Sequence, residues 1–149
     1  MNALATDQSK RIAELIHNSP ELRGNVTAGM YVGGLERTPS RTMSEHGIIT
    51  DHETLLNSPP DILLTNYKML DYLLVRPKDA LLWKQNNPET LKYIAVDELH
   101  TFDGAQGTDL ACLLRRLKRR LGIYDGYLCC IGTSATMGSK ENNLSLIHI

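Results

Sequence analysis

Four short apolar runs constrain the fold of this chain more than any other feature of its sequence. Segments with helical spacing separate the last three of these runs. The four runs cover residues 26–32, 62–65, 91–96 and 127–131. Continuous apolar runs are typical of strands buried on both faces, and helices between such strands favour parallel pairing. The sequence therefore predicts an α/β fold in which a parallel sheet is sandwiched by helices. Function in such sheets lies at the carboxyl ends of the strands.

Helical spacing is clearest in two segments, residues 2–16 and 107–121. The second places five leucines on one stripe: Leu110, Leu113, Leu114, Leu117 and Leu121. A shorter helix is expected at 67–75. Residues 35–60 are polar and contain three prolines, so we expect a partly structured surface loop there.

Length and composition exclude several classes of protein. A chain of 149 residues with 42% apolar content can form one domain with a core and is not disordered. No apolar run approaches the roughly 18–20 residues of a membrane span, and no leader-like segment opens the chain. We therefore expect a soluble, cytoplasmic protein with no membrane partner. The net charge of −1 gives no general attraction to nucleic acid.

The chain contains three cysteines, Cys112, Cys129 and Cys130. An odd number with two adjacent residues suits neither a disulfide framework nor the spacing of a zinc site. We interpret them as buried, reduced thiols.

The strongest chemical signal is the sequence Asp97-Glu98-Leu99-His100, directly after an apolar run. Two adjacent acids at the end of a buried strand are costly unless they are hydrated or have a function. The functional interpretation is a metal–nucleotide site. Asp97 would hold Mg²⁺, through water, and Glu98 would orient and help deprotonate an attacking water. The structural interpretation is that the acids simply begin a turn or helix.

A second polar sequence, Ser134-Ala135-Thr136, follows the last apolar run. Alone, this tripeptide is typical of a turn. Its position, one helix and one strand after the acid pair, is more specific. With both sequences in this order, the chain resembles the first RecA-like domain of superfamily 2 DEAD/DEAH-box helicases. The acid sequence matches motif II in its DExH form, and Ser134-Ala135-Thr136 matches motif III.

The resemblance covers nearly the whole chain. Residues 2–8 resemble motif Ia and residues 65–70 resemble motif Ib. Gly33-Gly34 falls where the family often carries a glycine pair, a simple turn being the alternative. The segment 97–116 is most similar to bacterial Lhr-like and other large DEAD/DEAH helicases that process DNA. The resemblance thus implies a RecA-like (P-loop NTPase) fold and an ATP-dependent DNA helicase or translocase.

The resemblance also assigns roles to single residues. Asp97, Glu98 and His100 would form the catalytic group that acts on ATP and Mg²⁺. His100, Ser134 and Thr136 would couple the nucleotide state to movement against a second RecA-like domain. The nucleic-acid backbone would be contacted by Asn2 (where many relatives carry Arg), Gly34, Thr65 and Asn66. The resemblance favours DNA over RNA, and small polar groups suit a motor that holds phosphates without reading bases.

A basic cluster lies beside the leucine stripe and consists of Arg115, Arg116, Lys118, Arg119 and Arg120. We interpret it as a solvated helix face, since most charge runs are solvated. A phosphate-binding strip is the alternative.

One motif of the family is absent from the sequence. Motif I, Gly-x-x-x-x-Gly-Lys-Ser/Thr, supplies the amides and lysine that hold phosphates, and no such string occurs. Because motif I precedes motif Ia in the family, we interpret Met1 as an internal methionine and residues 1–143 as a partial ATP-binding domain. Residues 144–149 match the translation of a common library adaptor, so we interpret them as a non-native tail. We expect this fragment to be inactive alone, with an incomplete fold and exposed apolar edges.

Two other functions are compatible with the sequence. One is a non-catalytic nucleic-acid-binding or regulatory module descended from a helicase. The other is a metal-dependent hydrolase using Asp97, Glu98 and His100, although ligands so close on one strand end need distant partners.

Overall fold

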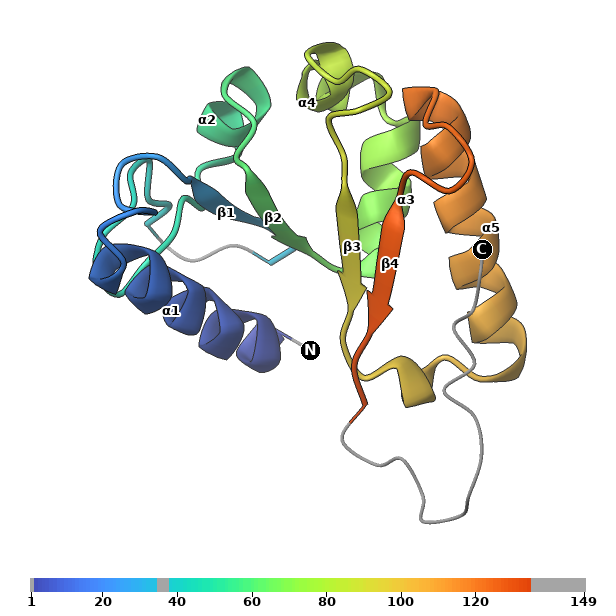
Figure 1. Ribbon diagram of the computed structural model, residues 1–149, viewed down its shortest axis with the longest axis horizontal. Coiled ribbons are helices and arrows are strands. Elements are labelled where there is room, and N and C mark those ends of the chain that lie inside the picture. The colour runs from blue at the N-terminus through green and yellow to red at the C-terminus, as the bar shows by residue number, and fades with distance from the viewer. Residues whose placement is uncertain (1, 35–37, 135–149) are drawn as a thin grey trace. The chain divides into compact units, whose positions relative to one another are not determined.

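A computed structural model of the chain describes residues 2–34 and 38–134, with side chains from residue 5 onward. The chain forms two compact units, Met1–Lys84 and Gln85–Ile149. Figure 1 labels their helices and strands. Each unit contains helices and one pair of parallel strands within the described residues. Alternating helices and parallel strands confirm the predicted α/β class.

The first unit contains both strands of one sheet and most of the helices. Its elements are α1 (Asn2–Asn18), β1 (Ala28–Tyr31), α2 (His52–Asn57), β2 (Ile62–Thr65), α3 (Tyr67–Val75), the 3₁₀ helix η1 (Pro77–Asp79) and α4 (Leu81–Lys84). β1 and β2 pair with Ala28 opposite Ile62 and Tyr31 opposite Thr65. Their carboxyl ends therefore lie at one edge of this sheet.

β1 is buried along its whole length because apolar side chains cover both of its faces. Successive strand residues point to opposite faces of a sheet. Ala28 and Met30 accordingly pack in one cluster with Ile16 of α1. Tyr31 packs in a second cluster with Leu73 of α3. The apolar run at this strand thus supplies the core of the first unit.

α2 lies inside the segment 35–60, where the sequence predicts a partly structured loop. Its six residues are too few for a periodic pattern, but a cap marks its start: Asp51 Oδ2 accepts a hydrogen bond from the Thr54 amide at 2.9 Å. A Cβ added at Gly29 would overlap Leu55 Cδ2, so glycine permits the close packing of α2 on β1.

The second unit carries the remaining strands. Its elements are β3 (Tyr93–Val96), the 3₁₀ helix η2 (Leu99–Thr101), α5 (Gly104–Leu121) and β4 (Cys129–Gly132). The five leucines of the predicted stripe are buried on α5. The helix ends at Leu121, and Gly122 follows with a left-handed φ of 64°, so that the Ile123 amide donates back to the Lys118 carbonyl at 3.0 Å.

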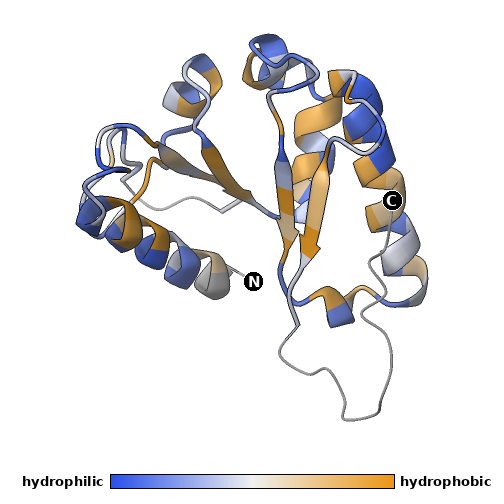
Figure 2. Cartoon of the chain, viewed as in Figure 1, coloured by the Kyte–Doolittle hydropathy of each residue, from blue (hydrophilic) through white to orange (hydrophobic). Residues whose placement is uncertain are grey.

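The predicted burial of β2, β3 and β4 was wrong, because these strands are half-buried or exposed. Tyr93 of β3 and Ile131 of β4 are 66% and 46% exposed. In the described part of the chain, β3 and β4 each have one partner strand and are therefore edge strands. Figure 2 shows apolar residues along both strands, so the expected exposed apolar edges are present.

The predicted burial of the cysteines was also wrong. Cys112 and Cys129 are exposed and Cys130 is half-buried, and all three are free thiols. Cys112 lies on the face of α5 opposite the leucines, and Cys129 lies on an edge strand. Separately, none of the helices within the described residues is both long enough and apolar enough to cross a membrane.

Candidate functional site

The predicted acid pair and Ser134 lie at the same edge of the β3–β4 sheet. The strands run in parallel, with Val96 opposite Gly132 at their carboxyl ends. Asp97 and Glu98 directly follow β3, and Ser134 follows β4 after one residue. Parallel pairing therefore brings together side chains that are more than thirty residues apart in sequence. This edge is the candidate site.

Backbone hydrogen bonds extend the strand pairing into the site. The Thr133 amide donates to the Val96 carbonyl at 2.9 Å, and the Leu99 amide donates to the Thr133 carbonyl at 2.8 Å. A Cβ added at Gly132 would overlap Leu99 Cδ2, so glycine at this position lets η2 fold over the end of β4. The two strand ends are thereby fixed to each other by main-chain contacts.

Thr133 also holds Asp97, and this role was missed from the sequence. The Thr133 hydroxyl donates to Asp97 Oδ1, which also accepts the Glu98 amide at 3.0 Å. Both contacts orient the carboxylate in an exposed position. The signal available in the sequence was Thr133 itself, a polar β-branched residue between the apolar run and Ser134. Such a residue is easily interpreted as the last residue of the strand.

Glu98 has a backbone conformation that is unusual for its residue type. Its φ of 54° and ψ of 43° are left-handed, and no other non-glycine residue in the described ranges has a positive φ. This conformation costs about 1–2 kcal/mol. The Glu98 carbonyl accepts hydrogen bonds from the Thr101 amide at 2.8 Å and from its hydroxyl at 2.9 Å, which stabilise the turn. Strained backbone that is held in this way is common at functional sites.

A chain of polar contacts crosses the site from one strand end to the other. His100 Nε2 lies 3.2 Å from Glu98 Oε2. His100 Nδ1 lies 3.0 Å from Ser134 Oγ. The side chains of Glu98 and His100 are each 39% exposed, so solvent and ligands can reach them. We call these three side chains, Glu98, His100 and Ser134, the polar relay.

The acids fit a magnesium ion that arrives with a nucleotide. Mg²⁺ binds oxygen ligands and commonly takes one or two carboxylates together with phosphates and waters. Asp97 offers such a carboxylate in an exposed, fixed position. The described residues include no group of three or more His, Cys, Asp or Glu side chains that could hold a metal ion by themselves. The metal-hydrolase alternative thus lacks a ligand set within the described part of the chain.

Three of the residues predicted to contact nucleic acid lie at the carboxyl edge of the other sheet, in the first unit. Thr65 ends β2, and its hydroxyl donates to the Tyr31 carbonyl at 2.7 Å. Asn66 caps α3, since its Oδ1 accepts the Met69 amide at 2.8 Å. Gly34 follows β1 and has a left-handed φ of 79°. Thr65 and Asn66 therefore have structural contacts in addition to any role in binding.

Some predicted positions are beyond what the structure describes. Asn2 is the first residue of α1, but its side chain is outside the described part. Thr136 and the expected tail at 144–149 also lie outside the described residues. Their predicted roles stay predictions.

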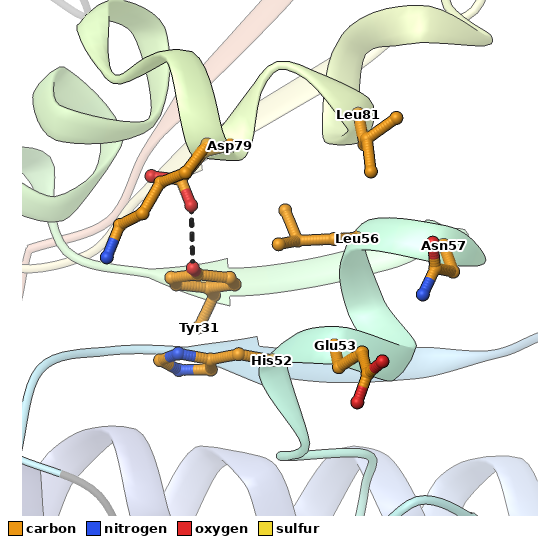
Figure 3. Close-up of a pocket in the computed structure, with 8 residues that line it drawn as sticks. Tyr31, His52, Glu53, Leu56, Asn57, Asp79 and Leu81 are labelled. Carbon is orange, nitrogen blue, oxygen red and sulfur yellow. Dashed lines mark hydrogen bonds between the residues drawn. The ribbon is translucent and has the colours of Figure 1, made fainter.

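A second polar cluster lines a pocket of about 410 Å³ in the first unit (Figure 3). The Tyr31 hydroxyl donates to Asp79 Oδ1 at 2.9 Å, and Arg76 Nη2 lies 2.6 Å from Asp79 Oδ2. Burial and the neighbouring Asp79 carboxylate raise the pKa of Tyr31 to about 12. The His52 ring stacks on Tyr31 with centroids 3.7 Å apart. Because the Asp79 carboxylate contacts side chains of its own unit, Tyr31 and Arg76, we interpret this cluster as structural.

The fold and the candidate site define an α/β protein whose acidic and hydroxyl side chains meet at the carboxyl edge of parallel strands. The family model for DEAD/DEAH box helicases matches residues 1–144. The chain therefore belongs to the DEAD/DEAH box helicase family, and the resemblance seen in the sequence is confirmed.

Individual relatives support the Lhr-like placement. The ATP-dependent helicase Lhr-Core of Methanothermobacter thermautotrophicus is 34% identical over 142 residues, covering 95% of this chain and 15% of that protein. The Druantia protein DruE of Escherichia coli is 40% identical over 102 residues, covering 64% of this chain and 5% of that protein. The chain thus spans a small part of these relatives.

A solved structure confirms the RecA-like fold. The structure of Mycobacterium smegmatis helicase Lhr bound to ssDNA and AMP-PNP is similar to this chain with a TM-score of 0.54 and 26% identity. The likeness covers 85% of this chain and 14% of that one.

Proposed function

We propose that this chain is part of the motor of an ATP-dependent DNA helicase or translocase, in which ATP hydrolysis drives movement along the nucleic acid. Family membership supports an ATP-hydrolysing enzyme. The observation that carries the proposal is the polar relay, because it connects Glu98, which follows β3, to the Ser134 hydroxyl, which follows β4.

In this proposal the acids divide the chemistry of hydrolysis. Mg²⁺, bound together with ATP, would neutralise charge on the phosphates, and Asp97 would hold it. Glu98 would orient the attacking water and accept its proton on the carboxylate. The contact with His100 at 3.2 Å would restrain that carboxylate. Thr133 would keep Asp97 in place through its hydroxyl.

The relay also suggests how hydrolysis is coupled to movement. His100 contacts Glu98 on one side and Ser134 on the other, so a shift of either strand end changes the position of the catalytic carboxylate. We infer that Ser134, together with Thr136, transmits this change to a second RecA-like domain. Closure of two domains around ATP would then assemble the complete site.

The DNA partner is proposed from the family and from the first unit. The related Lhr structure is of a complex with ssDNA. Gly34, Thr65 and Asn66 gather at one sheet edge and offer backbone and small polar groups, which suit sequence-independent contacts to phosphates. Asn2 is proposed as a further contact.

A chimera with a relative tests the catalytic proposal. Residues 1–143 would replace the matching segment of Lhr-Core, and ATP hydrolysis would be measured with and without single-stranded DNA. Glu98→Gln should lower kcat by about 100-fold or more, since it removes the acceptor of the water proton. Glu89→Gln is the matched control, because Glu89 is an exposed acid of the same unit that is remote from the relay in sequence.

Three outcomes separate the alternatives. A fall in kcat for Glu98→Gln but not for Glu89→Gln supports the proposal. Equal turnover in both variants contradicts the role of Glu98. A chimera that binds DNA but never hydrolyses ATP supports the non-catalytic module instead.

A further inference from the structure

The helicase motifs leave one strongly charged part of the molecule without a function. Residues 115–120 contain five of the chain's 16 lysines and arginines and no acidic residue. The chain as a whole carries a net charge of −1, so this concentration is local. The segment forms the C-terminal part of α5.

The arginines of this segment share one face of the helix. Arg115 and Arg119 are four residues apart, as are Arg116 and Arg120, so they form two neighbouring rows. All four side chains are exposed, whereas Leu117 between them is buried on the opposite side. We call Arg115, Arg116, Arg119 and Arg120 the arginine face.

The stability of α5 does not account for this arrangement. Cations stabilise the C-terminal end of a helix, but only within its last turn. Lys118, Arg119 and Arg120 lie in that turn, whereas Arg115 and Arg116 precede it. Lys118 pairs with Asp125 at 3.3 Å. Within the described residues, Arg115, Arg119 and Arg120 form no ion pair, so their charge is open to a ligand.

The residue type indicates which ligand fits. The arginine guanidinium is a planar fork of donors that matches phosphate in a bidentate manner. Surfaces for single strands add aromatic side chains on which bases stack, but α5 contains no aromatic residue. A duplex carries one phosphate charge per about 1.7 Å of its axis, against about 3.4 Å for each strand. A surface that contacts phosphates and offers no aromatic stacking therefore favours a duplex over a single strand.

We propose that the arginine face binds the phosphate backbone of double-stranded DNA, independently of sequence. The choice of DNA over an acidic protein surface rests on the proposed helicase function. The surface lies outside the helicase motifs of this chain, so it would add sequence-independent affinity for duplex DNA.

The test measures binding of the full 149-residue chain to a short fluorescein-labelled DNA duplex by anisotropy across a salt series. The triple variant Arg115→Gln/Arg119→Gln/Arg120→Gln should bind about 10-fold or more weakly, and the slope of log K against log salt should fall by about 2–3. The triple Arg→Lys variant keeps the charge and should retain most of the slope. Lys10→Gln/Lys84→Gln/Lys92→Gln removes three exposed cations elsewhere and should leave binding within about twofold of the unaltered chain.

Several results would overturn the proposal. They are no duplex binding by the unaltered chain, equal affinity of the Arg→Gln variant, or an equal loss in the lysine control. If the Arg→Gln variant loses binding to polyglutamate but not to DNA, the ligand of the arginine face is an acidic protein instead. If the triple variant unfolds, Arg115→Gln alone, outside the last turn, must lower the slope by about 1. The Lhr-Core chimera carrying the Arg→Gln changes should keep its ATP hydrolysis without DNA, so this proposal can fail while the proposed function stands.

Discussion

The surroundings of His52 favour its neutral form. Its ring stacks on Tyr31, and its Nε2 is buried without a hydrogen-bond partner among the described residues. Burial lowers the pKa of His52, and the nearby charges of Asp79 and Arg76 oppose each other in their effect. Protonation would place an unpaired donor and a charge against the buried face of the Tyr31 ring.

This environment predicts a loss of stability in mild acid. The folded-state pKa of His52 is below its value of about 6.5 in the unfolded chain, so the unfolded state binds more protons as the pH falls. The free energy of unfolding should therefore decrease as the pH drops below about 6.5. Urea titrations at several pH values would measure it.

His52→Phe is the matched variant for this prediction, because it keeps an aromatic ring on Tyr31 but cannot titrate. Its unfolding free energy should show a smaller slope between mildly acidic and neutral pH. Identical slopes in the two proteins would show that His52 makes no contribution.

Asn66 combines a structural contact with a proposed role in nucleic-acid binding. Its Oδ1 caps α3 through the Met69 amide. Asn66→Ala should destabilise the chain by about 1 kcal/mol through loss of the cap. Asn66→Asp retains a good cap but adds a negative charge beside any bound phosphate.

The two substitutions separate stability from binding at this position. We expect the midpoint temperature of thermal unfolding to be lower in Asn66→Ala and little changed in Asn66→Asp. If Asn66 contacts nucleic acid, single-stranded DNA binding should weaken in the Asp variant despite its stable fold. Normal DNA binding by the Asp variant would leave Asn66 as a capping residue only.

At the level of elements, local sequence patterns predicted the positions of helices and strands better than they predicted the burial of those elements. β2 and α3 lie at the predicted positions, because an apolar run and a helical spacing can both be recognised within a short stretch of sequence. The placement of Glu98 and Ser134 at one edge followed from parallel pairing. Exposure of β3 and β4 could not be predicted in this way, since it depends on which segments cover the strands. Thr133 was missed because its hydroxyl acts across the sheet on Asp97.

The whole chain combines well-packed parts with exposed apolar surface. β1 and the α5 leucines are buried, whereas Tyr93 and Ile131 are exposed. Edge strands with exposed apolar side chains promote association between chains. We therefore expect the isolated chain to be marginally stable and prone to aggregate.

Calorimetry and dye binding would measure this marginal stability. Thermal unfolding should be broad, begin near ordinary temperatures and depend on protein concentration, and the folded chain should bind a hydrophobic dye. Tyr93→Thr/Ile131→Thr should reduce both dye binding and association, since it replaces exposed apolar groups with a strand-compatible polar residue. A sharp, concentration-independent transition at high temperature would contradict the expectation.

The polar relay also makes His100 a built-in spectroscopic reporter. Its ring contacts the segment after β3 through Glu98 and the segment after β4 through Ser134. The ring-proton resonances of His100 in an NMR spectrum therefore depend on both contacts at once. Comparing the spectra of Glu98→Gln and Ser134→Ala with that of the unaltered chain would reveal, without any attached label, whether the two strand ends stay aligned in solution.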